Sequence, residues 1–309
     1  MKSVRILLAT YNGSKFVGEM IDSILAQDYT DWQLILSDDG SKDETPDILK
    51  EYARKYPDLI TYYRSGIRFG NAQNHFMHLL KVFGDAPYIM FCDQDDVWHP
   101  DKISKTMEKM KQIEVPDKPA MVHTDLRVVD GQLNLMAPSF IHFSKLDGNR
   151  LGLNQLLVQN VVTGCTMMIN RPLAEIAVTR IPREGILMHD WWLALIAAAL
   201  GTTGYLNEAT IDYRQHGNNA VGAKNSRSLR YIFNKIITDG VGAAMHLTYQ
   251  QAGIFYETFA DLLAERDKTI VAAYASLENA GFFERRSVFI RHSFYKFGRL
   301  RVVAQMIWG

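Results

Sequence analysis

The first 100 residues alternate short apolar runs with segments of helical periodicity, and this alternation limits the fold more than any other feature of the sequence. Four apolar runs are typical of buried strands and cover residues 4–10, 32–37, 59–64 and 88–92. Between them, apolar residues recur at helical spacing over residues 16–25, 45–56 and 71–83. Strands that alternate with helices in this way pair in parallel through right-handed crossovers. The sequence therefore predicts an α/β fold with a mostly parallel, Rossmann-like sheet flanked by helices.

Beyond Pro100 the regular alternation ends and the elements become mixed. The pattern predicts a helix to about residue 113, a strand pair within 121–130, a helix near 151–159 and a strand at 165–169. An apolar helix over 189–200 ends at Gly201, and short strands follow as far as Arg214. After Gly222 the sequence becomes helical and amphipathic. We therefore expect an α/β domain over residues 1–221 and a helical C-terminal extension over residues 222–309.

Composition excludes several classes of protein. Lys and Arg together number 34, as do Asp and Glu, so the overall charge gives no reason to expect a nucleic-acid partner. The two cysteines, Cys92 and Cys165, are too few for a disulfide framework and fit a reducing cytosol. The longest apolar run, residues 191–200, is roughly half of the ~20 residues that a membrane span requires. Residues 1–12 fit a first strand better than a signal peptide, and we expect a cytoplasmic protein.

Polar residues follow three of the predicted strands at the point where each strand ends. They are Thr10-Tyr11-Asn12 after the first strand, Asp38-Asp39-Gly40-Ser41 after the second and Asp93-Gln94-Asp95 after the fourth. Ligands of parallel sheets bind beyond the carboxyl ends of the strands, so these residues are candidates for one site. The carboxylates of Asp93 and Asp95 suit Mg²⁺ or Mn²⁺, which share their coordination shell with a substrate diphosphate. The alternative is an acidic turn that caps the next helix.

The second strand end offers a similar choice. The carboxylate of Asp39 could accept the imide N–H of a pyrimidine base, with Gly40 allowing a tight turn. The alternative is that Asp38 and Ser41 simply cap the turn, as Asp and Ser often do. We expect Asp39 to contact the base. Without such a role, the two acidic strand ends would have come together only by chance.

Three stretches in order, TYNGSKFVGEMIDSILAQ, WQLILSDDGSKDET and YIMFCDQDDVWHPDKI, resemble the nucleotide-binding half of the family 2 inverting glycosyltransferases of GT-A fold. The resemblance covers roughly residues 3–220, and it makes residues 1–221 a nucleotide-sugar-binding and catalytic domain. It implies a nucleotide pocket lined by Thr10, Tyr11, Asn12, Asp39, Asp93 and Gln94. It also implies that Asp95 holds the metal ion, Mn²⁺ or Mg²⁺. The stretch RFGNAQNHF resembles the segment over the nucleotide in this family and adds Arg68, Gly70 and Asn74.

Downstream, MHDWWLALIAAALG is similar to the segment that supplies the catalytic carboxylate in this family, which would be Asp190. Inversion at an anomeric carbon needs a base opposite the leaving diphosphate, and an Asp at the start of an apolar helix would have a raised pKa suited to this role. The alternative is simple helix capping. Asn160 and the turn Thr163-Gly164-Cys165 resemble the acceptor-side loop of the family. We interpret Cys165 as a small buried residue, not a nucleophile.

The stretch IDYRQHGNNAVG follows a predicted strand and precedes a glycine-rich loop. The imidazole of His216 could complete the metal shell, and Arg214 could neutralise the diphosphate. For His216, an ordinary surface or hydrogen-bonded histidine is an equal alternative.

Within the family, CDQDDVWHP together with HDWW and YRQHGNN is most similar to bacterial rhamnosyltransferases, in particular the streptococcal enzymes of rhamnose-rich cell-wall polysaccharide synthesis. That resemblance implies dTDP-β-L-rhamnose as donor, an α-L-rhamnosyl product and a lipid-linked saccharide acceptor. The alternatives are a UDP-hexose donor or a non-catalytic nucleotide-sugar-binding protein, although Asp190 and the complete Asp93-Gln94-Asp95 motif argue against the latter. A Rossmann dehydrogenase would need GxGxxG where this chain has TYNGSKFVG.

The last 28 residues, 282–309, carry six Lys or Arg against the single acidic residue Glu284. Aromatic residues are interleaved with these charges, a composition that suits an amphipathic helix on an anionic membrane surface. The alternative is a helix that packs on the catalytic domain or forms a homo-oligomer contact. We expect peripheral association with the inner face of the cell membrane through this segment.

Overall fold

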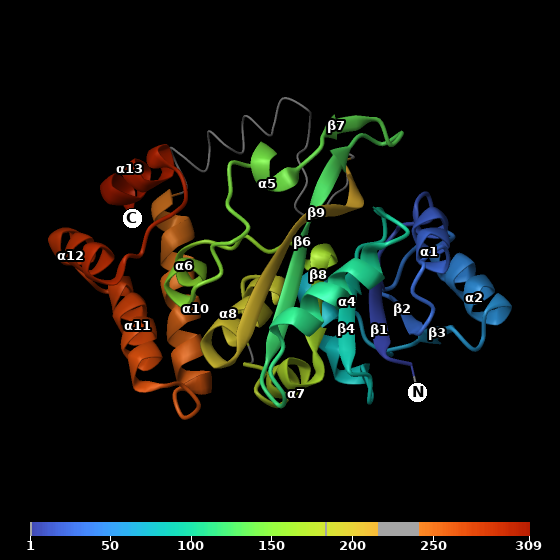
Figure 1. Ribbon diagram of the computed structural model, residues 1–309, viewed down its shortest axis with the longest axis horizontal. Coiled ribbons are helices and arrows are strands. Elements are labelled where there is room, and N and C mark those ends of the chain that lie inside the picture. The colour runs from blue at the N-terminus through green and yellow to red at the C-terminus, as the bar shows by residue number, and fades with distance from the viewer. Residues whose placement is uncertain (1, 183, 216–240) are drawn as a thin grey trace.

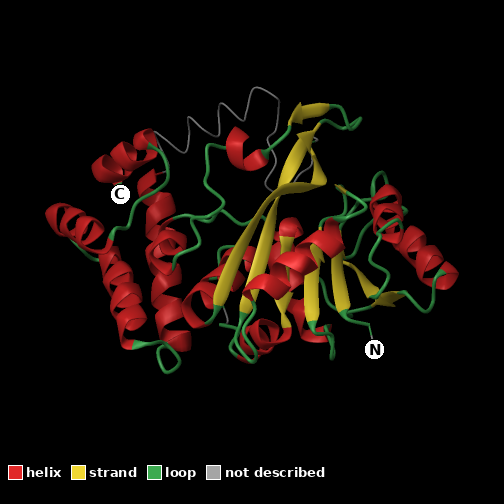
Figure 2. Ribbon diagram, viewed as in Figure 1, coloured by secondary structure: helices red, strands yellow, loops and turns green. Residues whose placement is uncertain are grey.

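The structure is a computed structural model that describes residues 2–182, 184–215 and 241–309. Its described residues form one nine-stranded sheet in the order β3-β2-β1-β4-β8-β6-β9-β5, with β7 paired to β6 (Figure 1). In Figure 2 the strands lie between α1 and α2 at one end of the molecule and four C-terminal helices at the other. The predicted α/β fold with a C-terminal helical extension is confirmed.

The N-terminal half of the sheet is parallel, as predicted. Its strands are β1 (Val4–Thr10), β2 (Trp32–Asp38), β3 (Ile60–Tyr63) and β4 (Tyr88–Cys92). The intervening helices are α1 (Val17–Leu25), α2 (Thr45–Lys55) and α3 (Ala72–Leu79), which continues as a 3₁₀ turn over Leu80–Val82. In the parallel register Thr10 lies beside Asp38, and Leu8 lies beside Cys92. The polar segments after β1, β2 and β4 therefore meet at one edge of the sheet.

The second half of the sheet mixes strand directions. Strand β8 (Met167–Asn170) runs antiparallel between β4 and β6 (Ala120–Val129), and β9 (Thr202–Arg214) is parallel to β6. The short strands β5 (Val97–Trp98) and β7 (Leu135–Ala137) pair antiparallel with β9 and β6.

Three local expectations for this half are wrong. A single strand, β6, covers Ala120–Val129 where a pair was expected within 121–130. The short strands expected before Arg214 are one continuous strand, because β9 pairs along the whole of β6. Cys165 lies in a 3₁₀ turn, Gly164–Thr166, ahead of β8. Strand β5 was not predicted, because two residues are too short to produce a periodic signal.

Two apolar cores lie on the two faces of the sheet. Alternate side chains of β1 separate them: Ile6 and Leu8 pack in one core, and Leu7 packs in the other. The first core is covered by α1, α2 and α4 (Lys102–Ile113). The second contains α3, α6 (Leu153–Val158), α7 (Arg171–Thr179) and α8 (His189–Leu200). Helix α8 is apolar around most of its surface and is almost completely buried, as such a helix must be.

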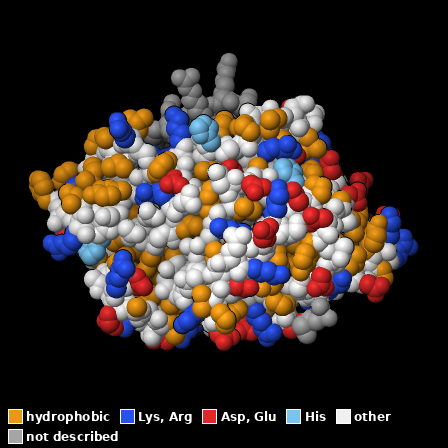
Figure 3. All heavy atoms as spheres, viewed as in Figure 1, with side chains coloured by type: hydrophobic (Ala, Val, Ile, Leu, Met, Phe, Trp, Pro, Cys, Tyr) orange, Lys and Arg blue, Asp and Glu red, His pale blue; other side chains and the backbone are white. Residues whose placement is uncertain are grey.

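The C-terminal helices extend the second core. They are α10 (Val241–Phe259), α11 (Glu265–Ala275), α12 (Phe282–His292) and α13 (Arg299–Trp308). The Trp192 ring of α8 lies 5.4 Å from Phe255 and 5.8 Å from Phe259 of α10, centroid to centroid. Residues 282–309 form two helices, α12 and α13, where one was expected. Figure 3 shows hydrophobic side chains gathered at the end of the molecule that these helices occupy. Among the described helices, none combines the length and the apolar character needed to cross a bilayer.

Candidate active site

The segment after β1 is held against the segment after β4 by a side-chain clamp. The backbone N–H of Tyr11 donates to Gln94 Oε1 at 2.8 Å, and Gln94 Nε2 donates to the Tyr11 carbonyl at 3.1 Å. The clamp passes over Gly13, where a Cβ atom would lie 2.3 Å from Gln94 Oε1. Any larger residue at position 13 would displace Gln94. Two residues predicted to bind the nucleotide, Tyr11 and Gln94, are therefore fixed to each other.

Asn12 and Asp38 build the turns on which the site rests. Asn12 has a left-handed backbone (φ 49°), which Asn tolerates better than most residues, and its Oδ1 accepts from the Lys42 N–H at 2.9 Å. The Asp38 carboxylate accepts from Thr10 Oγ1 at 3.0 Å and from the Gly40 and Ser41 N–H groups at 3.0 and 2.8 Å. The capping interpretation of Asp38 is confirmed. The hydrogen bonds of Asn12 and of the buried Thr10 also stabilise these turns.

Asp39 connects the end of β2 to the loop before α3. Its carboxylate is buried and accepts from the backbone N–H groups of Phe69 and Gly70, the latter at 2.8 Å. The Phe69 ring stacks on His75 at 4.8 Å, and His75 Nε2 lies 2.8 Å from Ser37 Oγ. Burial lowers the pKa of His75 to about 4, so at neutral pH this imidazole is uncharged. Asp39 therefore shapes the loop that was expected to lie over the nucleotide, and contact with the base remains a prediction.

Arg68 lies over the exposed Tyr11 ring, 5.1 Å from its centroid, and donates to the Tyr11 hydroxyl at 2.9 Å. This contact between two predicted nucleotide-binding residues joins the segment after β1 to the 65–71 loop. Asn74 sits in the first turn of α3, where its N–H is capped by Asn71 Oδ1 at 2.8 Å. Its side chain approaches only the Phe69 carbonyl, at 3.5 Å.

The acidic segment after β4 contains three carboxylates in different surroundings. Asp93 is half-buried, Asp95 is 9% exposed and Asp96 is fully buried. Desolvation raises the pKa of Asp93, and the negative charges of Asp95 and Asp190 raise it further. Burial likewise raises the pKa of Asp96 well above its usual range. For Asp93 and Asp96, nearby positive charge does not offset the cost of burial.

A divalent cation fits this segment. Ligand atoms of Asp93, Asp96 and Cys165 lie within 4.8 Å of one another, and Asp96 Oδ2 is buried with no hydrogen-bond partner among the described residues. Burial raises the pKa of the Cys165 thiol well above its usual range, so the thiol is protonated in the metal-free protein. Carboxylate oxygens are what Mg²⁺ and Mn²⁺ prefer. Asp96 was not among the predicted ligands, although the run Asp93-Gln94-Asp95-Asp96 already contained it. The predicted ligand Asp95 is not part of this group of described residues, so its contact with the metal stays a prediction.

Lys102 is a second residue that the sequence analysis missed. It is fully buried at the start of α4, with Nζ 4.7 Å from the centroid of the Trp98 ring and 3.5 Å from Thr210 Oγ1. Burial lowers its pKa to about 8, and the negative charge of Asp96 opposes that shift. This ammonium group is therefore a fixed counter-charge behind the acidic segment. A lone Lys in a helical stretch gives no sequence signal for such burial.

Arg214, the last residue of β9, holds the acidic segment in place through hydrogen bonds. Its backbone N–H donates to Asp96 Oδ1 at 3.1 Å, and its guanidinium donates to the Asp95 carbonyl at 2.9 Å, the Gly131 carbonyl at 3.0 Å and Glu19 Oε2. The side chain is 3% exposed and also covers the Phe16 ring. Arg214 is thus committed to the scaffold in this structure, and its predicted contact with the diphosphate remains untested. His216 lies outside the described residues.

Asp190 stands at the first turn of α8, facing the acidic segment. Its Oδ1 accepts from Asn160 Nδ2 at 3.1 Å and from the Trp191 N–H at 2.6 Å, and its Oδ2 accepts from the Gly164 N–H at 2.9 Å. Desolvation raises the pKa of Asp190 to about 6 despite these hydrogen bonds. The structure thus brings together Asp190 and two of the three predicted acceptor-side residues. The third, Thr163, uses its carbonyl to cap the Gly164–Thr166 turn.

His189 precedes Asp190 and packs entirely in apolar surroundings. Its ring lies 4.5 Å from Phe76 and 5.4 Å from Phe91, centroid to centroid, and neither ring nitrogen has a hydrogen-bond partner among the described residues. Desolvation lowers its pKa to about 3. A Cβ atom at Gly164 would lie 2.6 Å from its Nε2, so glycine is required where this ring meets the Asp190 loop.

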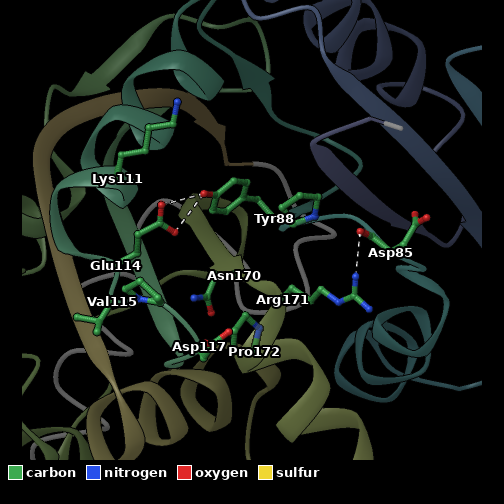
Figure 4. A pocket seen from close by; sticks show the side chains of 11 residues that line it. Asp85, Tyr88, Lys111, Glu114, Val115, Asp117, Asn170, Arg171 and Pro172 are labelled. Carbon is green, nitrogen blue, oxygen red and sulfur yellow. Dashed lines mark hydrogen bonds between the residues drawn. The ribbon is translucent and has the colours of Figure 1, made fainter.

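One well-formed hollow of the described structure does not coincide with this site. It has a volume of about 530 Å³ and lies at the opposite edge of the sheet, beside the start of β4 and the end of α4 (Figure 4). There Tyr88 donates to the Glu114 carboxylate, and Arg171 donates to the Asp85 carbonyl. Ligands of parallel sheets bind at the carboxyl edge, so we place the active site with the acidic residues and not in this hollow.

The fold and the acidic edge leave the family open, and comparison with known proteins supplies it. Residues 5–175 match the family model "Glycosyl transferase family 2". The chain belongs to glycosyl transferase family 2. It is 29% identical over 232 residues to the dTDP-rhamnosyl transferase RfbG of Shigella flexneri, which covers 72% of this chain and 76% of that protein. It spans about half the length of two similar glycosyltransferases from Rickettsia.

Solved structures show the same fold. S. aureus TarS 1-349 in complex with UDP superposes with a TM-score of 0.56 at 14% identity, covering 96% of this chain and 93% of that chain. The mannosyltransferase PcManGT from Pyrobaculum calidifontis, in complex with GDP-Man and Mn²⁺, gives a TM-score of 0.56 at 16% identity and covers 98% and 83%. The GT-A-like architecture predicted from the sequence is thereby confirmed.

Proposed function

We propose that this chain is an inverting glycosyltransferase in which Asp190 is the catalytic base. The observation that carries the proposal is a buried carboxylate with a pKa raised to about 6, facing the Asp93–Asp96 segment at the carboxyl edge of the sheet. A base of this pKa is ionised at neutral pH and is still basic enough to take a proton as the transition state forms.

The proposed reaction is a single displacement. The acceptor hydroxyl oxygen forms a bond to the anomeric carbon on the face opposite the diphosphate, the bond from that carbon to the diphosphate oxygen breaks, and the hydroxyl proton passes to the Asp190 carboxylate. Asn160 Nδ2 and the Gly164 N–H hold that carboxylate in one orientation. Their hydrogen bonds favour the ionised form and so keep the base ready between turnovers.

The donor would bind along the clamped strand ends. We assign the base of the nucleotide to the neighbourhood of Tyr11, Arg68 and Asp39, because these residues offer a planar aromatic ring, a cation and an acceptor. When bound, Mn²⁺ or Mg²⁺ held by Asp93 and Asp95, with Asp96 adjoining, would neutralise charge on the leaving diphosphate. His216, if it ligates, would join that set.

For the donor sugar we propose dTDP-β-L-rhamnose, with an α-L-rhamnosyl product on a lipid-linked saccharide in cell-wall polysaccharide synthesis at the cytoplasmic side of the membrane. The likeness to the dTDP-rhamnosyl transferase RfbG, at 29% identity over 72% of this chain, supports that donor. A UDP-hexose is the alternative donor, and a nucleotide-sugar-binding protein without activity is the alternative function.

Thermal denaturation with dTDP, UDP and GDP, each with and without Mn²⁺, separates these possibilities. We expect dTDP with Mn²⁺ to raise the midpoint most, because a ligand at about 100 times its Kd stabilises a protein by ~2.7 kcal/mol. A larger shift with UDP would move the donor to a UDP-hexose. Donor binding without transfer to any saccharide acceptor, by the wild type at neutral pH, would favour the binding protein.

A further inference from the structure

The face formed by α12 and α13 exposes seven large apolar side chains. They are Phe282, Phe283, Ile290, Leu300, Val303, Ile307 and Trp308, and each is 47–85% exposed. We call these residues the apolar end face. Soluble surfaces seldom gather so many large apolar groups on two adjacent helices, and such a patch marks a binding surface. Figure 3 shows the gathering at the end of the molecule beyond α11.

The apolar end face is a built surface. Arg286 of α12 donates to the carbonyls of Met306, Ile307 and Gly309 at 2.9–3.0 Å, which caps the end of α13, and its guanidinium covers the Phe282 ring at 3.6 Å. Arg301 of α13 donates to the Ser144 carbonyl at 2.8 Å. Phe282 and Ile307 therefore flank one guanidinium, and both helices are fixed to the body of the protein.

We propose that the apolar end face docks the protein on an anionic lipid surface. Residues 282–309 carry six Lys or Arg and one acidic residue, so the segment that presents the apolar groups has a net positive charge. Exposed Phe and Trp among basic residues match the boundary between acyl chains and anionic headgroups. The charge also argues against a second copy as occupant, because a two-fold contact would bring two positively charged faces together.

The charges divide into two groups with different duties. Arg285, Arg286 and Arg301 bond backbone carbonyls within the protein, and Lys296 is partly buried. Arg291 and Arg299 are exposed. The exposed pair can reach lipid headgroups without breaking the fold. Arg291 and Arg299 are therefore the residues whose charge can be reversed without unfolding the helices.

The helices that carry the apolar end face are joined to the segment that leads into the acceptor side of the active site. In the connection between α12 and α13, the Phe297 N–H donates to Gln159 Oε1 at 2.8 Å, and Asn154 Nδ2 of α6 donates to the His292 carbonyl at 3.3 Å. Gln159 is followed directly by Asn160, which bonds Asp190. If the proposed function holds, docking at this face brings the membrane to the flank where a lipid-linked acceptor would enter.

The test is flotation of the full chain with vesicles of phosphatidylglycerol and, separately, of phosphatidylcholine. We expect binding to the anionic vesicles only, falling about tenfold between low and physiological salt because exposed charges are screened. The double variant Arg291→Glu/Arg299→Glu should lose at least about tenfold of that binding. The same change at Arg54 and Lys55, exposed on α2 at the other end of the molecule, should have little effect.

A second variant tests the apolar contribution. Phe283→Ser/Leu300→Ser should weaken flotation at both salt concentrations, whereas Leu135→Ser, a residue 58% exposed on β7, should not. Absence of anionic-vesicle binding by the wild type would overturn the proposal. So would a dimer in sedimentation that Phe283→Ser/Leu300→Ser abolishes, because the face would then bind a second copy. Vesicle binding that persists in Asp190→Asn without turnover keeps this inference separate from the proposed function.

Discussion

The two sides of the acidic edge are built in opposite ways. On the nucleotide side, Asp38, Asp39 and Gln94 have their polar atoms bonded to neighbouring backbone groups, so this side is a rigid scaffold. On the acceptor side, Asp190 lies near Asp93 of the predicted nucleotide and metal site, and desolvation raises the pKa of both carboxyl groups. The scaffold is complete without a ligand, whereas the buried carboxylates become more stable when positive charge or a proton arrives.

This difference suggests a division of labour. A preformed scaffold binds a donor without ordering itself first, which saves conformational entropy on binding. Carboxylates held in an unfavourable charged state make better bases and better cation ligands than solvated ones. Changes on the acceptor side should therefore reduce turnover, and changes on the nucleotide side should reduce donor affinity.

The largest effect is expected for Asp190→Asn. Loss of the base should lower kcat by about 10²–10³-fold and leave donor affinity nearly unchanged, because the side chain acts on the acceptor proton. Steady-state kinetics with a saccharide acceptor, together with donor titration, would measure both. Asp261→Asn, an exposed carboxylate paired with Arg180, is the matched control. Turnover within a few-fold of wild type would remove Asp190 from the mechanism.

Asp95→Ala should have the next largest effect. We expect loss of Mn²⁺-dependent donor binding and a drop in turnover of about 10²-fold, since an oxygen ligand is removed from the proposed metal site. Asp101→Ala, six residues further along at the start of α4, serves as control. Calorimetry of donor binding with and without Mn²⁺ would show the effect. Unchanged Mn²⁺-dependent binding would place the cation on Asp93 and Asp96 alone.

The sequence predicted the convergence of the three polar strand ends because that depends on strand order and direction, which alternation reveals. It also placed Asn160, Gly164 and Asp190 in one neighbourhood, through family resemblance, and the structure brings all three into contact. What it could not reveal were partners that are distant along the chain. Arg214 bonds Glu19, 195 residues away, and no local pattern encodes that pairing.

Burial of charged residues was equally hidden from the sequence. Lys102 and Asp96 both look like solvent-exposed residues of a capped helix start, and only the packing of β5 against β9 and α1 encloses them. The mixed strand directions were hidden for the same reason. The sequence of a strand such as β8 does not indicate whether it runs parallel or antiparallel to its neighbours. Contacts between segments distant along the chain determine both the burial of these residues and the directions of the strands.

The pH dependence of kcat/KM tests the role of Asp190 on the acceptor side. Because the pKa of Asp190 is raised to about 6, kcat/KM should fall about tenfold per pH unit below that value and level off above it. A bound cation near Asp93 favours the carboxylate form of Asp190, so the midpoint should move to lower pH as Mn²⁺ is increased. Donor affinity measured without metal should vary less over the same range. A flat kcat/KM profile between pH 5 and about 8 would contradict the assignment.

The smallest effect is expected on the nucleotide side, for Gly13→Ala. The new Cβ would lie 2.3 Å from Gln94 Oε1, at the flexible end of that side chain, so Gln94 must move and its two hydrogen bonds to Tyr11 must lengthen or break. Loss of about 1 kcal/mol of positioning energy would weaken donor binding about fivefold, with kcat little changed.

Two further comparisons complete the test of Gly13→Ala. Gly253→Ala in α10, where an added Cβ meets no atom within 4 Å, should leave donor affinity unchanged and slightly stabilise the helix. Gln94→Ala combined with Gly13→Ala should cost no more than Gln94→Ala alone, since the clash with Gln94 is the only route by which the added methyl group acts. If the double variant binds the donor much more weakly than Gln94→Ala, Gly13 has a direct contact with the donor. The scaffold would then touch its ligand through backbone as well as side chains.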